Sequence, residues 1–270
     1  MEVFEMTVKY EIHGDDLQFV RFLLNQGESL VAEAGALLFM DSTLEMETIF
    51  GDGSNANQGA GLMGKLMGAG KRAIMGESLF MTLFTQSSYA EGEIAFAAPY
   101  PGKIIPLSLA DYQGTILCQK DAFLCAEKGT SLEIAFNRKI GVGLFGGEGF
   151  IMQKLQGSGM TFLHAGGAIY KRELNASETL KVDTGCLVAL TGSVHYDIEM
   201  VSSMKTALFG GEGLFFATLT GPGIVWLQSL PFSRLADRIM TSSRRAGHSG
   251  KGEGSMLDAL GGLGNLLDGK

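Results

Sequence analysis

LFGGEG, Leu144–Gly149, returns unchanged 64 residues later as Leu208–Gly213. A weaker copy lies upstream in IMGESLF, at residues 74–80. Each copy carries a Gly-Glu pair ahead of an apolar run that is typical of a strand. The six repeated residues are Gly76, Glu77, Gly147, Glu148, Gly211 and Glu212. Because self-similarity at a regular spacing is the signature of repeated structural units, we predict three related β units.

A second block also recurs three times, beginning at Ala36, Thr115 and Cys186. Each copy consists of an apolar run, a short polar turn and an alternating run, which is the pattern of a β-hairpin. In residues 194–200, apolar and polar side chains alternate strictly, as they do in a strand with one buried face. We therefore predict an all-β fold whose strands pair as antiparallel hairpins.

The composition supports a globular β protein and disfavours nucleic acid as a partner. The chain has 270 residues, 46% of them hydrophobic, with 39 Gly and only 5 Pro, which favours turn-rich β structure. Its net charge of −8 repels polyanions, and its basic residues cluster only in pairs, so we expect no DNA partner and disfavour RNA. With no visible signal peptide and three cysteines without disulfide or zinc spacing, a cytoplasmic location is expected.

We predict four regions along the chain. They are a first β unit at 1–100 with a Gly-rich insertion at about 51–75, a second at 101–175, a third at 176–240 and a flexible Gly/Ser-rich tail at 241–270. The third unit ends in a helix with Ser233 as its N-cap and Leu235 and Ile239 on one face. The uncharged run 213–233 contains Gly221-Pro222-Gly223, so it predicts two paired strands rather than a membrane helix.

The glycines of GVGLFGGEGF, residues 141–150, match the spacing of a dinucleotide-binding loop. The first two of them, Gly141 and Gly143, are not repeated in the later copy, and the next residues contain too many glycines for a long helix. We therefore reject a nucleotide loop. The repeated Glu77, Glu148 and Glu212 could ring an axis and bind a cation, but we favour carboxylates that accept N–H bonds within their own turns.

No catalytic or metal-binding constellation is visible in the sequence. The four histidines are scattered without ligand spacing, at His13, His164, His195 and His248. Ser78 lacks the second glycine of a nucleophile elbow, and Cys118 and Cys125 flank a turn without a histidine nearby in sequence. We expect no enzymatic activity, no metal and no cofactor.

Two glycine-rich segments are candidate contact regions. The 51–75 loop is Met-rich and carries basic residues, at Lys65, Lys71 and Arg72, while the 247–270 tail carries apolar residues on a glycine background. Either segment could touch a membrane surface or a protein partner, or could simply be exposed to solvent.

The repeated segments carry a family resemblance. MGESLFMTLF, GLFGGEGFIMQKLQGSGMTFLHAGGAI and LFGGEGLFFATLTGPGIVWLQS, together with the tail, resemble the family that includes the mitochondrial biogenesis protein called altered inheritance of mitochondria twenty-four. The resemblance implies a fold similar to the tryptophan RNA-binding attenuation protein, with three short jelly-roll-like β-sandwich units in pseudo-threefold arrangement. It implies no established reaction, and a bacterial-type cytosolic relative is the better match.

The functional hypothesis is a non-catalytic oligomeric scaffold, formed by homo-oligomers in the cytoplasm or at a membrane face. Internal repetition without a catalytic constellation motivates it. The alternative is a small-ligand or RNA-binding β-sandwich module, and a weaker one is a metal enzyme of the cupin type.

Overall fold

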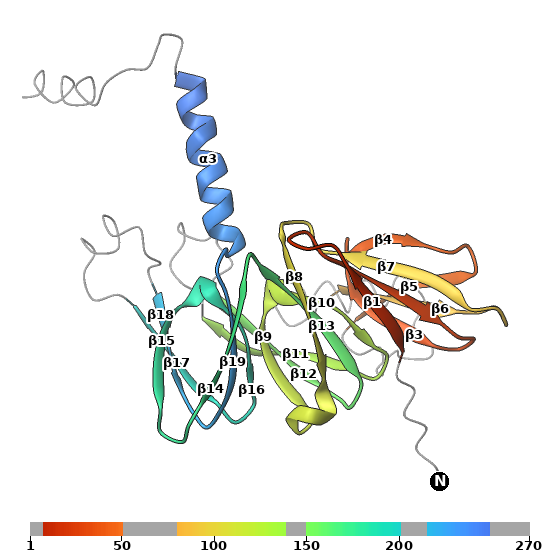
Figure 1. The fold of residues 1–270 in the computed structure, drawn as a ribbon, viewed down its shortest axis with the longest axis horizontal. Coiled ribbons are helices and arrows are strands. Elements are labelled where there is room, and N and C mark those ends of the chain that lie inside the picture. Colours follow the sequence, from red (N-terminus) through yellow and green to blue (C-terminus); the bar gives the residue numbers. More distant parts are fainter. Residues whose placement is uncertain (1–7, 51–79, 139–149, 201–214, 249–270) are drawn as a thin grey trace, which may run out of the picture. The chain divides into compact units, whose positions relative to one another are not determined.

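The structure is a computed structural model that describes residues 8–50, 80–138, 150–200 and 215–248 (Figure 1). In these residues the chain is mostly strands with one C-terminal helix, so the predicted all-β class is confirmed. Every pairing between the strands is antiparallel. Four sheets result, which we name A to D.

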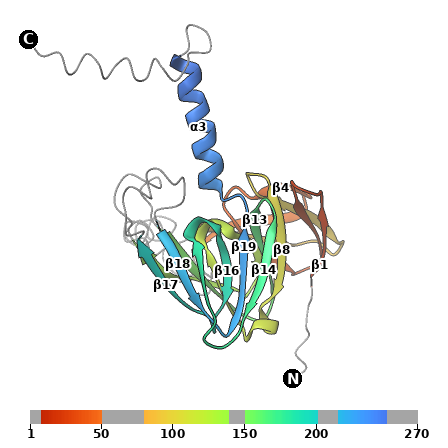
Figure 2. The ribbon, with the colours of Figure 1, turned by 60° about the vertical axis from the view of Figure 1, so that its left-hand side comes forward.

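Each sheet has its own order of strands in space. Sheet A consists of β1 (Lys9–His13), β2 (Phe19–Leu24), β7 (Gly92–Ala97) and β4 (Leu37–Met40). Sheet B consists of β5 (Leu44–Phe50), β6 (Phe80–Gln86), β3 (Ser29–Glu33), β10 (Phe123–Glu127), β13 (Met160–Gly166) and β8 (Gly102–Ser108). Sheet C consists of β11 (Ser131–Arg138), β12 (Phe150–Gln156), β9 (Thr115–Gln119), β16 (Leu187–Thr191), β19 (Gly223–Gln228) and β14 (Ile169–Leu174). Figure 2 shows β16, β19 and β14 side by side. Sheet D consists of β15 (Thr179–Asp183), β18 (Phe215–Thr220) and β17 (His195–Met200).

Three hydrophobic cores join the sheets in succession. The first core contains Phe22 and Phe96 from sheet A and Leu30 from sheet B. The second joins sheets B and C, and the third joins sheets C and D around residues such as Leu190 and Leu219. Sheets B and C therefore contribute to a core on each of their faces, and strands such as β10 and β16 are continuous apolar runs.

The strand order repeats three times. Strands β2 to β7 alternate between sheets A and B in the order A, B, A, B, B, A. Strands β8 to β13 repeat this order between sheets B and C, and strands β14 to β19 repeat it between sheets C and D. We call these sets the first, second and third β units. Each unit is a sandwich of two sheets that shares one sheet with each neighbouring unit.

The three predicted hairpins are wrong in their pairing. Within each block the two strands enter different sheets: β4 and β5 in A and B, β9 and β10 in C and B, and β16 and β17 in C and D. The reason is that both strands of a block supply apolar residues to the same core from opposite sides. Met40 and Leu44, for example, flank the turn at Asp41 and both pack into the first core. The turn is a corner between two sheets.

The uncharged run 213–233 also forms a corner. It contains two strands, β18 and β19, as predicted, with a cis peptide bond between Gly221 and Pro222 in the turn. The predicted pairing of the two strands is wrong, because β18 pairs with β15 and β17 while β19 pairs with β14 and β16. Likewise β12 follows Gly149 directly, so a strand occupies the place that a nucleotide-binding helix would need.

The C-terminal helix α3 spans Phe232–His248. It begins one residue before Ser233, so Ser233 lies in the first turn and is not the N-cap that the sequence predicts. The helix belongs to a unit that is separate from Met1–Pro231. Among the described residues, no helix combines the length and hydropathy that a membrane span requires. The domain boundaries at 100 and 175 remain predictions.

Candidate interaction site

Strand β4 is a free edge of sheet A. Among the described residues it pairs with β7 alone, so the opposite row of its backbone groups has no strand partner. Its side chains Leu37, Leu38 and Phe39 are 37, 51 and 41% exposed. An apolar edge strand that is exposed and paired on one side only is a template for pairing with another chain.

The corresponding strands of the other two units are covered. Register places Leu37, Leu38 and Phe39 where β10 has Phe123, Leu124 and Cys125 and where β16 has Leu187, Val188 and Ala189. All six of those counterparts are at most 2% exposed. The exposure of β4 is therefore a consequence of its terminal position in the row of units, since the same place in the fold is buried twice elsewhere.

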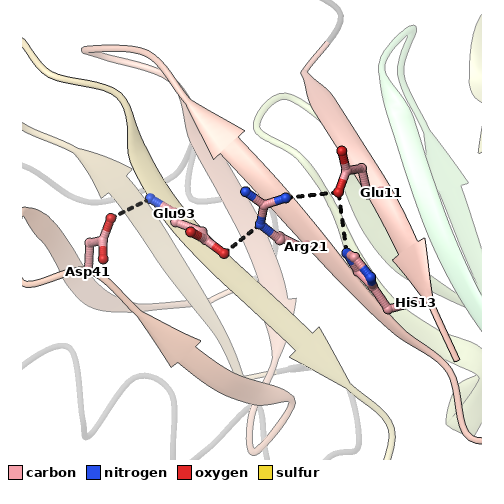
Figure 3. Close-up of polar contacts among 5 residues, drawn as sticks. All are labelled: Glu11, His13, Arg21, Asp41 and Glu93. Atoms are coloured by element: carbon pink, nitrogen blue, oxygen red, sulfur yellow. Dashed lines mark hydrogen bonds and ion pairs between the residues drawn. The ribbon is translucent and has the colours of Figure 1, made fainter.

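A row of charged side chains crosses the outer face of sheet A beside this edge (Figure 3). Arg21 on β2 donates through Nε to Glu93 on β7 at 2.5 Å and through Nη1 to Glu11 on β1 at 2.8 Å. His13 Nε2 lies 3.3 Å from the same carboxylate of Glu11. The hydrogen bonds that Arg21 donates to these two carboxylates raise its pKa, the bond to Glu93 contributing most.

Asp41 links this row to the free edge. Its Oδ2 accepts a hydrogen bond from the backbone N–H of Glu93 at 2.8 Å (Figure 3). The same contact recurs in the other units, where Glu127 accepts from Met160 at 2.8 Å and Thr191 Oγ1 accepts from Ile224 at 3.1 Å. The repeated bond holds the corner after β4, β10 and β16 in one geometry.

A second group of ionisable side chains lies between the first and second units. Burial raises the pKa of Glu33 to about 7, and the nearby charge of Asp121 adds to this effect while Lys120 opposes it. Tyr100 donates to the backbone carbonyl of Asp121 at 3.4 Å and meets the ring of His164 edge-on at 4.5 Å.

Burial also governs the other two groups of this cluster. It raises the pKa of Tyr100 to about 12, with smaller contributions from Asp121 and Glu33, and lowers the pKa of His164 to about 4. Proximity alone, without a base positioned on a nucleophile, assigns no reaction to these groups. In the part of the chain that the structure describes, no group of three or more His, Cys, Asp or Glu is placed to hold a metal ion.

Most of the sequence-predicted sites lie outside the described residues. This holds for the six Gly-Glu residues (Gly76, Glu77, Gly147, Glu148, Gly211 and Glu212) and for the basic loop residues (Lys65, Lys71 and Arg72). Their roles therefore stay predictions. Cys118 and Cys125 are buried free thiols whose pKa is raised by burial, as expected of small core residues.

The sequence does not single out the free edge. Its pattern predicts the apolar run that begins at Ala36 as one strand of a hairpin. Only the sheet topology shows the difference. Among the residues that the structure describes, β10 and β16 each pair with two strands, whereas β4 pairs with one.

The fold and this edge define a class: an all-β protein of tandem sandwich units in which, among the described residues, an apolar edge strand is paired on one side alone. The chain belongs to the AIM24 family, described as mitochondrial biogenesis AIM24, whose sequence pattern matches residues 10–230. The predicted family resemblance is thereby confirmed.

Two proteins from Streptococcus pyogenes are similar to this chain, one in sequence and one in fold. An uncharacterized protein of serotype M6 (strain ATCC BAA-946 / MGAS10394) is 30% identical over 219 residues, which cover 80% of this chain and 83% of the relative. A crystal structure of another S. pyogenes protein is similar in fold, with a TM-score of 0.70 at 24% identity, and the match covers 87% of this chain and 99% of that chain.

Proposed function

We propose that the protein is a non-catalytic scaffold that works by self-assembly through the free edge of sheet A. The observation that carries the proposal is the exposed apolar strand β4, because its counterparts in the second and third units are buried. Natural proteins usually protect such edges with charges, proline or bulges that block pairing. Strand β4 has no charge or proline within Leu37–Met40, and its one bulge, at Leu38, is shared with the paired strands β10 and β16.

The charged row beside β4 supports the same proposal. Interfaces commonly surround an apolar centre with a polar rim that remains hydrated. Arg21, Glu93 and Glu11 supply such a rim next to Phe39, which lies opposite Ala95 on the outer face of the sheet. Exposed ion pairs of this kind contribute little to stability by themselves, so they serve orientation more than affinity.

The test is sedimentation velocity of the full-length protein at micromolar concentration. We expect species larger than one chain for the wild type and a shift toward monomer for Leu38→Glu, which places a charge on the edge. Tyr89→Glu is the matched control, because Tyr89 is 93% exposed in the turn between β6 and β7. A wild-type protein that remains strictly monomeric would overturn the proposal.

A second function, contact with a membrane surface, is favoured by helix α3. Phe232, Leu235, Ala236, Ile239 and Met240 recur at helical spacing and form one apolar stripe. Phe232, Ile239 and Met240 are exposed, at 49, 60 and 55%. The helix sequence carries four arginines against one aspartate, in a chain whose net charge is −8. A basic helix with one apolar face is the pattern of an interfacial helix on anionic lipid.

Vesicle co-sedimentation tests this second function. We expect the full-length protein to bind vesicles of phosphatidylcholine with added phosphatidylglycerol, and to release as salt is raised. Ile239→Glu should weaken binding by roughly tenfold, since it removes an apolar side chain from the contact. Ser242→Glu adds the same charge at an exposed polar position and should retain most of the binding. Equal binding to neutral vesicles, or equal loss in both variants, would contradict the assignment.

A further inference from the structure

Neighbouring β units are connected by a pairing between one strand of each unit, which we call a joint. The two joints in the chain pair equivalent strands. In the first joint, β10 of the second unit pairs with β3 of the first unit. In the second joint, β16 of the third unit pairs with β9 of the second unit. Strands β4, β10 and β16 hold the same place in their units, as do β3, β9 and β15. Each joint therefore adds a strand of the β4 type to a strand of the β3 type.

The register of the two joints is also the same. In the first joint Cys125 lies opposite Ala32 and Ala126 lies opposite Val31. In the second joint Ala189 lies opposite Cys118 and Leu190 lies opposite Leu117. The spacing of the repeated Gly-Glu pairs makes Thr82, Gln153 and Ala217 equivalent. These residues lie opposite Ala32, Cys118 and Val182, so those three are equivalent, and so are their neighbours Val31, Leu117 and Lys181.

The strands that enter the joints share one irregularity. In β10, β16 and β4 a single residue is skipped in the pairing with the neighbouring strand of the same unit (β13, β19 and β7), at Leu124, Val188 and Leu38. A bulge of this kind fixes which side chains face each side of the strand. Strand β4 thus has the same bulge as β10 and β16, the two strands that form the joints.

The row of units leaves one complementary edge at each end. Among the described residues, β4 pairs only with β7 and β15 pairs only with β18. One chain therefore offers an unmatched strand of the β4 type in its first unit and an unmatched strand of the β3 type in its third unit.

We propose that β4 of one copy pairs antiparallel with β15 of a second copy and reproduces the internal joints between chains. The repeated register places Phe39 opposite Val182, Met40 opposite Lys181 and Asp41 opposite Leu180. The proposal rests on the self-assembly proposed above and names its partner strand. Because the two edges differ, the contact is head-to-tail, and each array retains one free edge of each kind until it closes.

The side chains at this joint match the internal joints at one position and differ from them at the next. Val182 belongs to the third core, so Phe39 placed opposite it would extend that core, as Cys125 and Ala189 extend the cores at the internal joints. Lys181 replaces the apolar Val31 and Leu117 and is paired with Glu199 at 3.1 Å. The joint between chains is therefore more polar than the internal ones, which favours an association that depends on concentration and salt.

Cysteine cross-linking between two differently labelled chains tests the register. One full-length chain carries Phe39→Cys and the other carries Val182→Cys. Both chains also carry Cys186→Ser, because Cys186 is the native cysteine that is not buried, whereas Cys118 and Cys125 are buried and are left unchanged. Residues directly opposite in an antiparallel pair have Cβ atoms about 4.5–5.5 Å apart, within reach of a short bifunctional thiol reagent. The matched control replaces Val182→Cys by Lys181→Cys, whose side chain lies on the other face of β15.

We expect the mixture of the Phe39→Cys and Val182→Cys chains to give a cross-linked product that contains one chain of each kind. Its yield should be several times that of the control mixture with Lys181→Cys. An oligomer that forms without this product, or that gives equal yields with both partners, would overturn the β4 to β15 joint while leaving self-assembly standing. A product from the Phe39→Cys chain alone would show a symmetric β4 to β4 contact and would also overturn it. A monomeric protein would overturn both proposals.

Discussion

Glu33 connects the burial of a single side chain to the pH dependence of stability. It lies at the end of β3, next to the first joint, and burial raises its pKa from the ordinary value of 4.5 to about 7. The folded protein therefore binds more protons than the unfolded chain between these pH values. The stability that this group contributes is fully present below pH 4.5 and is lost as the pH rises toward 7.

Glu33→Gln should remove this dependence. The variant should be more stable than the wild type above pH 7, by about 3 kcal/mol at most, and equal to it below pH 4.5. Urea unfolding at a series of pH values measures the difference, and taking the difference cancels the opposite contribution of His164, whose pKa is lowered. Glu45→Gln, at an exposed position of β5, is the control. A constant difference between wild type and Glu33→Gln across this range would refute the prediction.

Corners between sheets, not hairpins, determine how the strands are arranged. The corner between β18 and β19 requires Gly223, whose φ is +146°. A Cβ at this position would clash with Thr191 Oγ1 and would lie 2.6 Å from Val194 Cγ2. The residue thus combines a backbone conformation that disfavours side chains with a close approach from the strand end of β16.

Gly223→Ala should destabilise the protein by about 2–4 kcal/mol, because it adds both backbone strain and a steric clash. Gly129→Ala is the matched control, since Gly129 has φ +100° but nothing within 4 Å of the added methyl, and it should cost only about 1–2 kcal/mol. Chemical denaturation measures both values. Equal losses for the two variants would show that the corner is not close-packed.

The sequence predicts strands well and their partners poorly. Alternation in residues 194–200 is confirmed, since Val194, Tyr196 and Ile198 are buried or half-buried while His195 and Asp197 are exposed. The predicted pairing fails because a run such as Leu37–Met40 is equally apolar in a hairpin and at a corner, and a short turn permits both. The side on which the next strand lies depends on which core it fills, and that involves residues far away in the chain.

The candidate site could not be predicted for a related reason. Leu38, Leu124 and Val188 are all aliphatic, so no residue type distinguishes the exposed strand from the buried ones. The difference arises only from the number of units: a row of three has two internal joints and two unmatched ends. The residues that the sequence does single out, such as Glu148, lie outside the described part of the chain.

At the level of the whole molecule, repetition explains both the fold and the proposed assembly. Three units with the same strand order are connected by two joints with the same pairing. The charged row through Arg21 lies next to the free edge strand β4. The same geometry that stabilises the single chain is thus available for joining chains. Membrane contact through α3 is proposed as a separate property.

Native mass spectrometry of the gently purified full-length protein is the most direct test of self-assembly. We predict a defined multiple of the 28.7 kDa chain with no added mass, and its collapse to single chains in Leu38→Glu. A wild-type monomer would contradict the proposed assembly, and a monomer with a reproducible extra mass would instead favour the ligand-binding or RNA-binding alternative.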